Sequence, residues 1–198
     1  AIPTTSGTGS EVTPFAVLKD GHRKISLIDE CLLPDVAIID AHLTRSLPPD
    51  ITGDTAFDAL THALEALVST FSSDYTDGLA LEALRLIFES LPETLKNPNN
   101  VLYRHKLHNA ATLAGMAIGN ASVGVNHALA HAFGARFDIA HGRANAAFLL
   151  STIEYNAQIP SKFVSIPCYP LWVADRKYAR AAQFIGLTVE PIEGEGEE

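Results

Sequence analysis

FDALTHALEA, residues 57–66, sets two potential metal ligands into a helical repeat of apolar residues. Asp58 and His62 are one helical turn apart, so both side chains project from the same face and can bind one ion. On its own, such an Asp-x-x-x-His pair is more often a solvent-edge pair or a hydrogen-bonded core histidine, because short motifs have many chance matches. A metal role therefore needs further ligands elsewhere in the chain.

Further ligands are found in NHALAHAFGARFDIAHG, residues 126–142. His127 begins a second apolar helical stretch, and His141 lies at a His-Gly break near its end. One carboxylate and three imidazoles form an oxygen and nitrogen set that suits Zn²⁺ or Fe²⁺ and needs no thiolate. Buried helical stretches penalise polar groups that lack a partner, which favours one shared ion over unrelated side chains. The two stretches together predict a divalent-metal site and hence a Lewis-acid enzyme.

The composition describes a globular chain of 198 residues, long enough to bury a sizeable core in one large or two small domains. Its net charge of −9 argues against nucleic acids and membranes as partners, since neither anionic surface attracts an acidic protein. Cys31 and Cys168 are too few and too far apart for a disulfide framework, which favours a reducing cytoplasm. No apolar run reaches the length of a membrane span.

Residues 1–47 are predicted to be rich in β-structure. A hairpin pattern surrounds Asp20-Gly21, a typical turn pair, and a later apolar run predicts a buried core strand. The three strands are expected at 15–19, 24–28 and 36–39.

From Pro48-Pro49 onward the apolar period changes from two to about three and a half, which is typical of helices. Pro92 is expected to end the second helix, and glycines in the third are expected to permit close contacts or to mark breaks. The helices are expected at 52–69, 77–91, 101–133, 143–157 and 175–185.

A second motif, TTSGTGSE (4–11), has the composition of an anion-binding loop. Glycines allow a backbone to approach a phosphate closely, and hydroxyl and amide groups donate to anionic oxygens. Gly/Ser/Thr clusters are more often ordinary turns, and this one lacks the full G-x-G-x-x-G pattern of a dinucleotide-binding turn. On its own the loop leaves both interpretations open.

Taken in order, these motifs resemble those of the iron-containing (group III) alcohol dehydrogenase family. The likeness is strongest to the alcohol dehydrogenase half of bifunctional acetaldehyde-alcohol dehydrogenases, and it extends to about Leu187. The segments that carry it are AIPTTSGTGSEVTPFAV, PDVAIIDAHL, FDALTHALEALVS, HNAATLAGMAIGNA and HALAHAFGARFDIAHGRANAAFLL. The family's Gly-Gly-Gly-Ser segment, which holds the pyrophosphate, has no counterpart here, so the chain looks like an internal fragment of such an enzyme.

The resemblance assigns roles to individual residues. The family's metal ligands match without substitution, at Asp58, His62, His127 and His141. The family's further histidine, beside the nicotinamide and the substrate, falls on His131, the candidate catalytic residue for proton relay; a supporting or packing role is the alternative. The positions that contact the cofactor fall on Thr4, Thr5, Gly7, Thr8, Val17, Lys24 and Leu43.

The same resemblance implies a domain organisation. Residues 1–47 would be the C-terminal part of an α/β dinucleotide-binding domain, and 48–198 a helical, metal-binding catalytic domain that is incomplete at its C-terminus. The expected fold class is thus an α/β remnant followed by an all-α metal-binding domain, as in the dehydroquinate synthase-like architecture. The implied activity is NAD(P)-dependent interconversion of a primary alcohol and an aldehyde at Fe²⁺ or Zn²⁺, with a small alcohol or aldehyde as substrate.

Two other functional classes stay open. One is a different metal-dependent enzyme on the same scaffold, such as a polyol dehydrogenase or a lyase resembling dehydroquinate synthase. The other is a non-catalytic fragment that binds metal, or that binds partner chains as in a homo-oligomer. Because remote parts of a cofactor help to position its reacting carbon, we expect a chain without the pyrophosphate segment to bind metal but to turn over little or no substrate.

Overall fold

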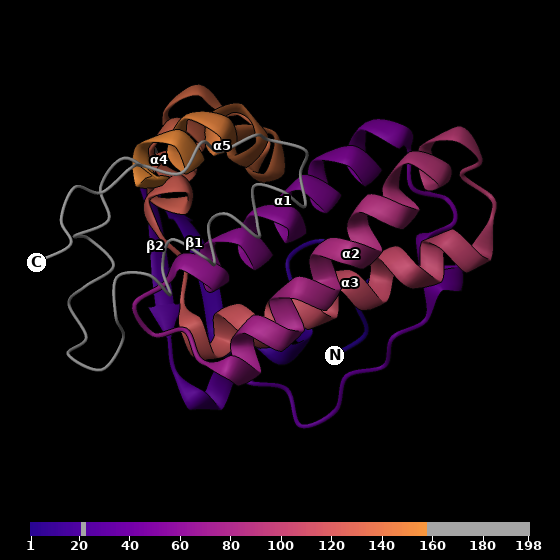
Figure 1. Cartoon of the computed structure of the whole chain (residues 1–198), viewed down its shortest axis with the longest axis horizontal. Coiled ribbons are helices and arrows are strands. Elements are labelled where there is room, and N and C mark those ends of the chain that lie inside the picture. The colour runs from indigo at the N-terminus through magenta and orange to yellow at the C-terminus, as the bar shows by residue number, and fades with distance from the viewer. Residues whose placement is uncertain (21–22, 158–198) are drawn as a thin grey trace, which may run out of the picture.

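The structure, a computed structural model, describes residues 1–20 and 23–157, which are mostly helical (Figure 1). The helices are α1 (Pro49–Val68), α2 (Asp74–Lys96), α3 (Val101–Ala121), α4 (Val125–Phe137) and α5 (His141–Ala157). They are preceded by an antiparallel hairpin, β1 (Phe15–Asp20) and β2 (Arg23–Ile28), and by short 3-10 helices, η1 (Ser10–Val12), η2 (Glu30–Leu32) and η3 (Ala41–Thr44). A small sheet-containing part followed by an all-α part is the fold class that was expected.

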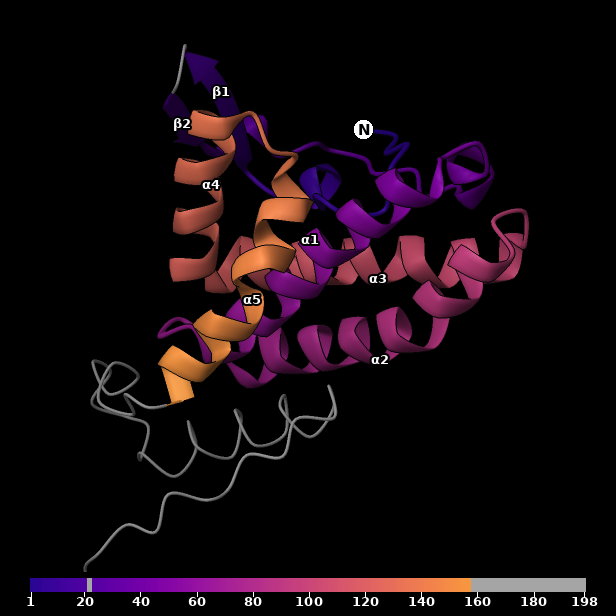
Figure 2. The same ribbon diagram turned by 90° about the horizontal axis from the view of Figure 1, so that it is seen from above.

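Helix α1 is the centre of the bundle, because α2, α3 and α5 all pack against it. Figure 2 shows α1, α2 and α3 running alongside one another, with α4 standing beside the hairpin. Small side chains dominate the contact surface, among them Ala56, Ala59, Ala63, Ala66, Ala80, Ala83, Ala110, Ala114 and Ala117. Alanines let helix axes approach closely, so polar side chains on this face of α1 are enclosed by neighbouring helices.

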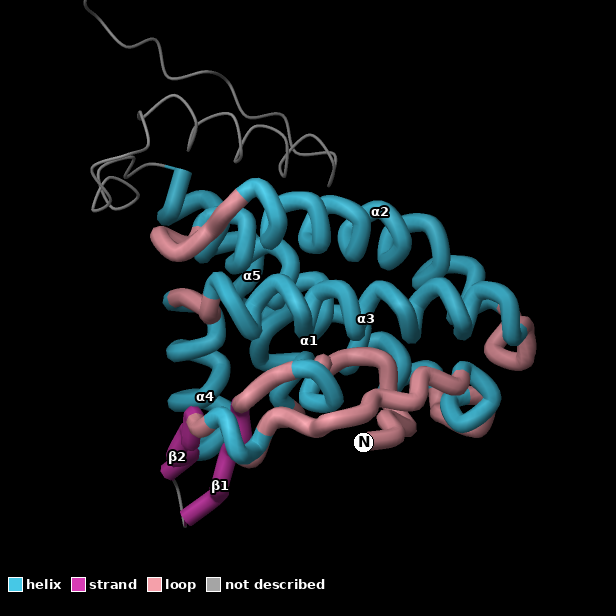
Figure 3. The backbone as a smooth tube through the Cα atoms, turned by 90° about the horizontal axis from the view of Figure 1, so that it is seen from below, coloured by secondary structure: helices cyan, strands magenta, loops and turns pink. Residues whose placement is uncertain are grey.

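The predicted hairpin is confirmed. β1 pairs with β2 so that Phe15 faces Ile28 and Lys19 faces Lys24. The turn residues 21–22 lie outside the described residues. Phe15 packs against the helical core and β2 contacts α4, so the hairpin covers the end of the bundle where α4 lies (Figure 3).

The expectation of a β-rich section over residues 1–47 is otherwise wrong. The run 36–39 is not a buried strand, because Val36 and Ile38 are 64% and 52% exposed. Its described backbone partner is Ala1, whose carbonyl accepts from the Ile38 N–H at 2.9 Å. A core strand needs a paired neighbour on each side and covered faces, and the described residues supply neither.

Helix α2 is longer than predicted at both ends. It begins at Asp74 because Ser73 and Thr76 form a capping box. Pro92 does not end it, although a proline removes one helical N–H and crowds the carbonyl one turn earlier. The helix continues to Lys96, since residues on both sides of Pro92 are buried against the core and hold that turn in place.

The long run expected at 101–133 is two helices. α3 ends at Ala121 because Ser122 has φ 64° and ψ −176°, a conformation that cannot continue a right-handed helix. Gly124 then precedes the first turn of α4. The turn between them redirects the chain, so α4 leaves α3 and crosses toward the hairpin (Figure 2).

The last two predicted helices have different outcomes. The helix expected at 143–157 begins earlier, at His141. The helix expected at 175–185 lies outside the described residues. Among the helices that the structure describes, none has the length and apolar character needed to cross a membrane.

Candidate metal centre

Helix α1 carries Asp58 and His62 into the interior of the protein. Their exposed fractions are only 4% and 5%, on the face of α1 that packs against other helices. Both side chains are polar, and burying either without a partner costs free energy. Asp58 and His62 therefore need polar partners inside the protein, and these come from α4 and α5, which pack near them.

Sharp turns before α4 and α5 place a histidine of each helix next to this pair. The turn after α3 places His127 in the first turn of α4, where it is buried. Asp138 ends α4 in the left-handed conformation, φ 54°, and His141 then begins α5. A Cβ atom on Gly142 would lie 1.8 Å from the carbonyl oxygen of Asp54 in α1, so only glycine permits this approach. The His-Gly pair of the motif thus brings His141 close to α1.

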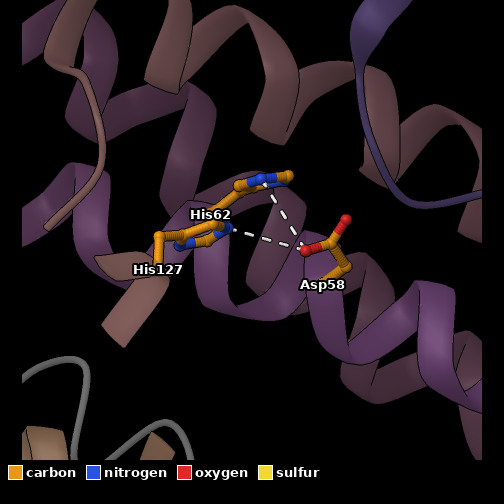
Figure 4. Close-up of side chains that lie close together, drawn as sticks. All are labelled: Asp58, His62 and His127. Atoms are coloured by element: carbon orange, nitrogen blue, oxygen red, sulfur yellow. Dashed lines mark ion pairs between the residues drawn. The ribbon is translucent and has the colours of Figure 1, made fainter. Parts of the chain in front are cut away.

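The structure brings the four predicted ligands together. Oδ1 of Asp58 lies 3.4 Å from Nε2 of His141, 3.6 Å from Nε2 of His127 and 3.9 Å from Nε2 of His62. Figure 4 shows Asp58, His62 and His127 directed toward one another, and their ligand atoms all lie within 4.8 Å. Tetrahedral metal bonds of about 2.0–2.2 Å separate ligand atoms by about 3.3–3.6 Å. The nitrogens of His141 and His127 meet that separation from Asp58 and His62 lies slightly beyond it, so a small side-chain movement would close this donor set on one divalent ion.

The charges in this cluster influence one another. Burial would raise the pKa of Asp58, but the surrounding histidines, His62 foremost, hold that pKa well below its usual range. Burial lowers the pKa of His62 to about 4 and that of His141 to about 4. Burial also acts to lower the pKa of His127, yet hydrogen bonds with Asp58 and Glu65 raise it to about 9. Metals bind carboxylates and neutral imidazoles, so Asp58, His62 and His141 have their metal-binding protonation states near neutral pH, whereas His127 must release a proton to bind an ion.

Three residues of the site were not predicted: Glu65, Asn126 and Asn145. Glu65 is buried on α1 and hydrogen-bonds to Nδ1 of His127, and its other oxygen accepts from the backbone N–H of Asn126 at 2.8 Å. Nδ2 of Asn145 donates to Oδ1 of Asp58 at 2.7 Å. A signal for two of them was present, since Glu65 follows His62 at helical spacing and Asn145 lies one turn after the last histidine.

His131, the predicted catalytic residue, lies beside the cluster rather than in it. Its ring centroid is 4.9 Å from that of His141 and 6.3 Å from that of His127. The side chain is half-buried, and burial together with the positive charge of Lys24 lowers its pKa.

The cluster borders a cavity of about 190 Å³ between the hairpin, α3 and α4. Its lining combines the histidines with hydroxyl and apolar side chains, among them Thr8, Thr13, Phe15, Ile118 and Val123. A larger cavity of about 250 Å³ is lined by Glu65 and by none of the histidines. The smaller cavity is the one in which a small molecule would meet the polar cluster.

The predicted cofactor positions lie in different surroundings. Thr8 lines the cavity, and Lys24 is close enough to Asp58 and His131 for their charges to act on one another. Val17 and Leu43 are half-exposed and are not among the described residues that line the cavity. Of the remaining positions, Thr4 is exposed, Thr5 is partly buried and Gly7 is buried.

The glycines of the 4–11 loop have a packing role. A Cβ atom on Gly7 would lie 2.7 Å from Cβ of Thr55 in α1, and one on Gly9, at φ 61°, would lie 2.4 Å from Cα of Gly115 in α3. Ser6 is also held, with its Oγ 2.9 Å from Nδ1 of His108. Close packing on two helices therefore explains these glycines without a phosphate.

Comparisons with known proteins match nearly the whole chain. The family model described as iron-containing alcohol dehydrogenase matches residues 1–41, and the model for the C-terminal part of the Fe-containing alcohol dehydrogenase family matches residues 52–198. An aldehyde-alcohol dehydrogenase from Streptococcus pneumoniae is 50% identical over 98% of this chain, which spans only 22% of that protein.

Solved structures show the same likeness. A 1,3-propanediol oxidoreductase superposes with a TM-score of 0.77 at 34% identity, over 95% of this chain and 53% of the other. A sulfoacetaldehyde reductase from Bifidobacterium kashiwanohense, crystallised with NAD⁺, superposes with a TM-score of 0.76 at 30% identity, over 95% of this chain and 52% of the other.

Proposed function

This chain belongs to the iron-containing alcohol dehydrogenase family, and from that premise we propose that its site serves the NAD(P)-linked interconversion of a primary alcohol and an aldehyde. The observation that carries the proposal is the convergence of three imidazole nitrogens on Oδ1 of Asp58 at 3.4–3.9 Å beside a small cavity. No polyol or phosphorylated substrate is favoured by a specific contact among the described residues.

We assign Asp58, His62, His127 and His141 as the ligands of one divalent ion. Such an ion would supply Lewis-acid chemistry to a hydroxyl or carbonyl oxygen in the cavity. Both Fe²⁺ and Zn²⁺ accept this donor set. The protein's own contribution is to bury the donors away from water and to orient them through hydrogen bonds, such as that from Asn145 to Asp58.

His131 is our candidate for moving the proton. It lines the cavity beside His141, and its lowered pKa keeps the ring neutral and able to accept a proton near neutral pH. Because the side chain is only half-buried, the proton can pass on to water.

We further propose that residues 1–47 belong to a dinucleotide-binding domain and 48–198 to a helical catalytic domain. The nicotinamide cofactor would supply the hydride chemistry. The support is the place of Thr8 and Lys24 beside the cavity and the bound NAD⁺ of the superposed sulfoacetaldehyde reductase. The proposed contacts to the cofactor are Thr4, Thr5, Gly7, Thr8, Val17, Lys24 and Leu43. Cys31 is exposed and forms no disulfide within the part of the chain that the structure describes, which agrees with the reducing cytoplasm that we propose.

The ligand assignment is tested by calorimetry. The metal-stripped chain is titrated with Zn²⁺ and, under anaerobic conditions, with Fe²⁺. We expect about one ion per chain, with the affinity strongly reduced in His141→Ala because one of its ligands is lost. The exposed His105 of α3 offers a matched control, and His105→Ala should bind the ion as the wild type does. Equal binding by all three proteins would contradict the assignment.

Turnover separates the functional classes. The metal-loaded chain is assayed with NAD⁺ and NADP⁺ on ethanol and 1-propanol, and on glycerol for comparison. We expect a small turnover of the primary alcohols that disappears on chelation. Tight metal binding without any turnover would favour the non-catalytic alternative, and turnover of glycerol alone would favour a polyol dehydrogenase.

A further inference from the structure

Glu65 is a buried carboxylate of the metal centre that is not itself one of the proposed ligands. It is 4% exposed on α1, on the same side as His62. A carboxylate at this depth needs a partner for each oxygen. One oxygen accepts from Nδ1 of His127, and the other accepts from the backbone N–H of Asn126 at 2.8 Å. Both partners belong to the first turn of α4.

These contacts determine which nitrogen of His127 carries a proton. An ionised carboxylate can only accept, so Nδ1 donates to Glu65. On the other side of the ring, Nε2 lies 3.2 Å from Nδ2 of Asn145, which is a donor because it also bonds the Asp58 carboxylate at 2.7 Å. With Nδ1 engaged by Glu65, Nε2 is the nitrogen that faces Asp58, at 3.6 Å from its Oδ1, and is the one placed to bind the ion.

The second oxygen of Glu65 holds the start of α4. The first N–H groups of a helix have no helical partner and form the positive end of its dipole, so a carboxylate is stabilised there. Gly124, just before α4, passes so close that a Cβ atom on it would lie 2.9 Å from Oε1 of Glu65. A rotation of α4 about its axis would break the contacts of both oxygens together.

We propose that Glu65 is the positioning residue of the metal centre: it fixes His127 as a donor at Nδ1 and holds α4 so that Nε2 faces the ion. The inference rests on the proposed function, in which Asp58 and the three histidines bind that ion. A carboxylate behind a metal-binding imidazole fixes the ring and raises its basicity, and its loss lowers metal affinity by about 10–100-fold.

Glu65→Gln is the decisive variant, because it keeps the size of the side chain and removes only the second acceptor. The backbone N–H of Asn126 can only donate, so it retains the amide oxygen, and the amide NH₂ is turned toward His127. Nδ1 must then accept, and the proton moves to Nε2, where the ion should bind. We expect the Zn²⁺ affinity from calorimetry to fall by about 10–100-fold, with an unchanged circular dichroism spectrum.

Glu11→Gln is the matched control. Glu11 is also a buried carboxylate, and it accepts from Oγ1 of Thr112 at 2.7 Å. The described contacts of its side chain include none of the four proposed ligands. The same isosteric change at this site should leave the Zn²⁺ affinity at the wild-type value.

A spectroscopic measurement on the wild type decides the matter even if Glu65→Gln does not fold. In the zinc-loaded chain, ¹⁵N NMR should show His127 protonated at Nδ1 and bound to zinc through Nε2. Zinc bound through Nδ1, or wild-type affinity in folded Glu65→Gln, would overturn the role of Glu65 alone. Failure of the wild type to bind Zn²⁺ would overturn the proposed function together with this inference.

Discussion

Asp58 is the residue on which the others in the site depend, because its Oδ1 is the common neighbour of three histidines and of Asn145. Its negative charge compensates part of the cost of burying imidazoles, and their presence in turn keeps it ionised. In this buried cluster the Asp58 carboxylate is shared by three weakly basic imidazoles. A divalent cation would accept a lone pair from each imidazole and would also balance the carboxylate charge. These residues therefore suit a metal ion better than they suit an ion pair between one histidine and Asp58.

His108 shows how a buried imidazole outside the site should respond to pH. It is buried on α3 against Ser6, and burial lowers its pKa, although the charge of Glu11 acts in the opposite direction. Below the unfolded pKa of about 6.5, the unfolded chain binds a proton that the folded chain does not. The free energy of unfolding should therefore fall as the pH falls from about 6.5 toward the folded pKa. His108→Gln should make this fall shallower.

Urea unfolding of the metal-free chain at a series of pH values from about 7.5 to about 5 measures this effect. The low pKa values of His62 and His141 contribute in the same direction. The raised pKa of His127 acts oppositely only above about pH 6.5, so the wild type and both variants should all lose stability between about pH 6.5 and about pH 5. His105→Gln, an exposed change on the same helix, should follow the wild-type curve. An unchanged pH dependence in His108→Gln would show that this imidazole does not contribute.

At the scale of elements, the turn between α3 and α4 positions several residues of the site. It ends α3 at Ser122, brings Gly124 against Glu65 and places His127 in the first turn of α4. Ser122 is not glycine, yet it adopts φ 64° and ψ −176°, a region that side chains with a Cβ atom rarely enter. The turn is therefore strained, and the surrounding packing maintains it.

Ser122→Gly should relieve that strain. A residue with a Cβ atom in this conformation costs about 1–3 kcal/mol, whereas the added flexibility of glycine in the unfolded chain costs about 0.5–1 kcal/mol. We expect the free energy of unfolding to rise by about 1 kcal/mol, measured by urea denaturation. The neighbouring Asn120→Gly lies inside the last turn of α3 and should have the opposite sign, a loss of about 0.3–0.5 kcal/mol from the lower helix propensity of glycine. Losses of similar size in both variants would show that Ser122 is not strained.

At the scale of the whole molecule, the features that the sequence predicts correctly are the local ones. The hairpin follows from alternation around a turn pair, and Asp58 with His62 follows from the spacing of one helical turn. Both depend on residues that are close in the sequence. The order of a small sheet-containing part and a helical part follows in the same way from the change of apolar period.

The features that the sequence does not predict depend on distant partners. The bond from His127 to Glu65 joins α4 to α1, and no local pattern selects that partner among the acidic residues. The run 36–39 has the composition of a core strand, but strands are buried only if neighbours cover them. Pro92 is a helix breaker by local rules, and tertiary packing of the same turn overrides those rules.

The arrangement of the bundle predicts where an ion would stabilise it. Helix α4 packs mainly on α5 and β2, and its contacts with α1 are few and centred on the metal site. An ion held by α1, α4 and α5 would therefore fasten α4 to the rest, adding about 2.7 kcal/mol at a free concentration of 100 times Kd. Chelation should lower the Tm, and hydrogen exchange should accelerate in 125–137 while the α2 and α3 amides that face each other keep their protection. Equal acceleration in all helices would show that the ion stabilises the fold as a whole, and no acceleration in α4 would show that the ion does not anchor this helix.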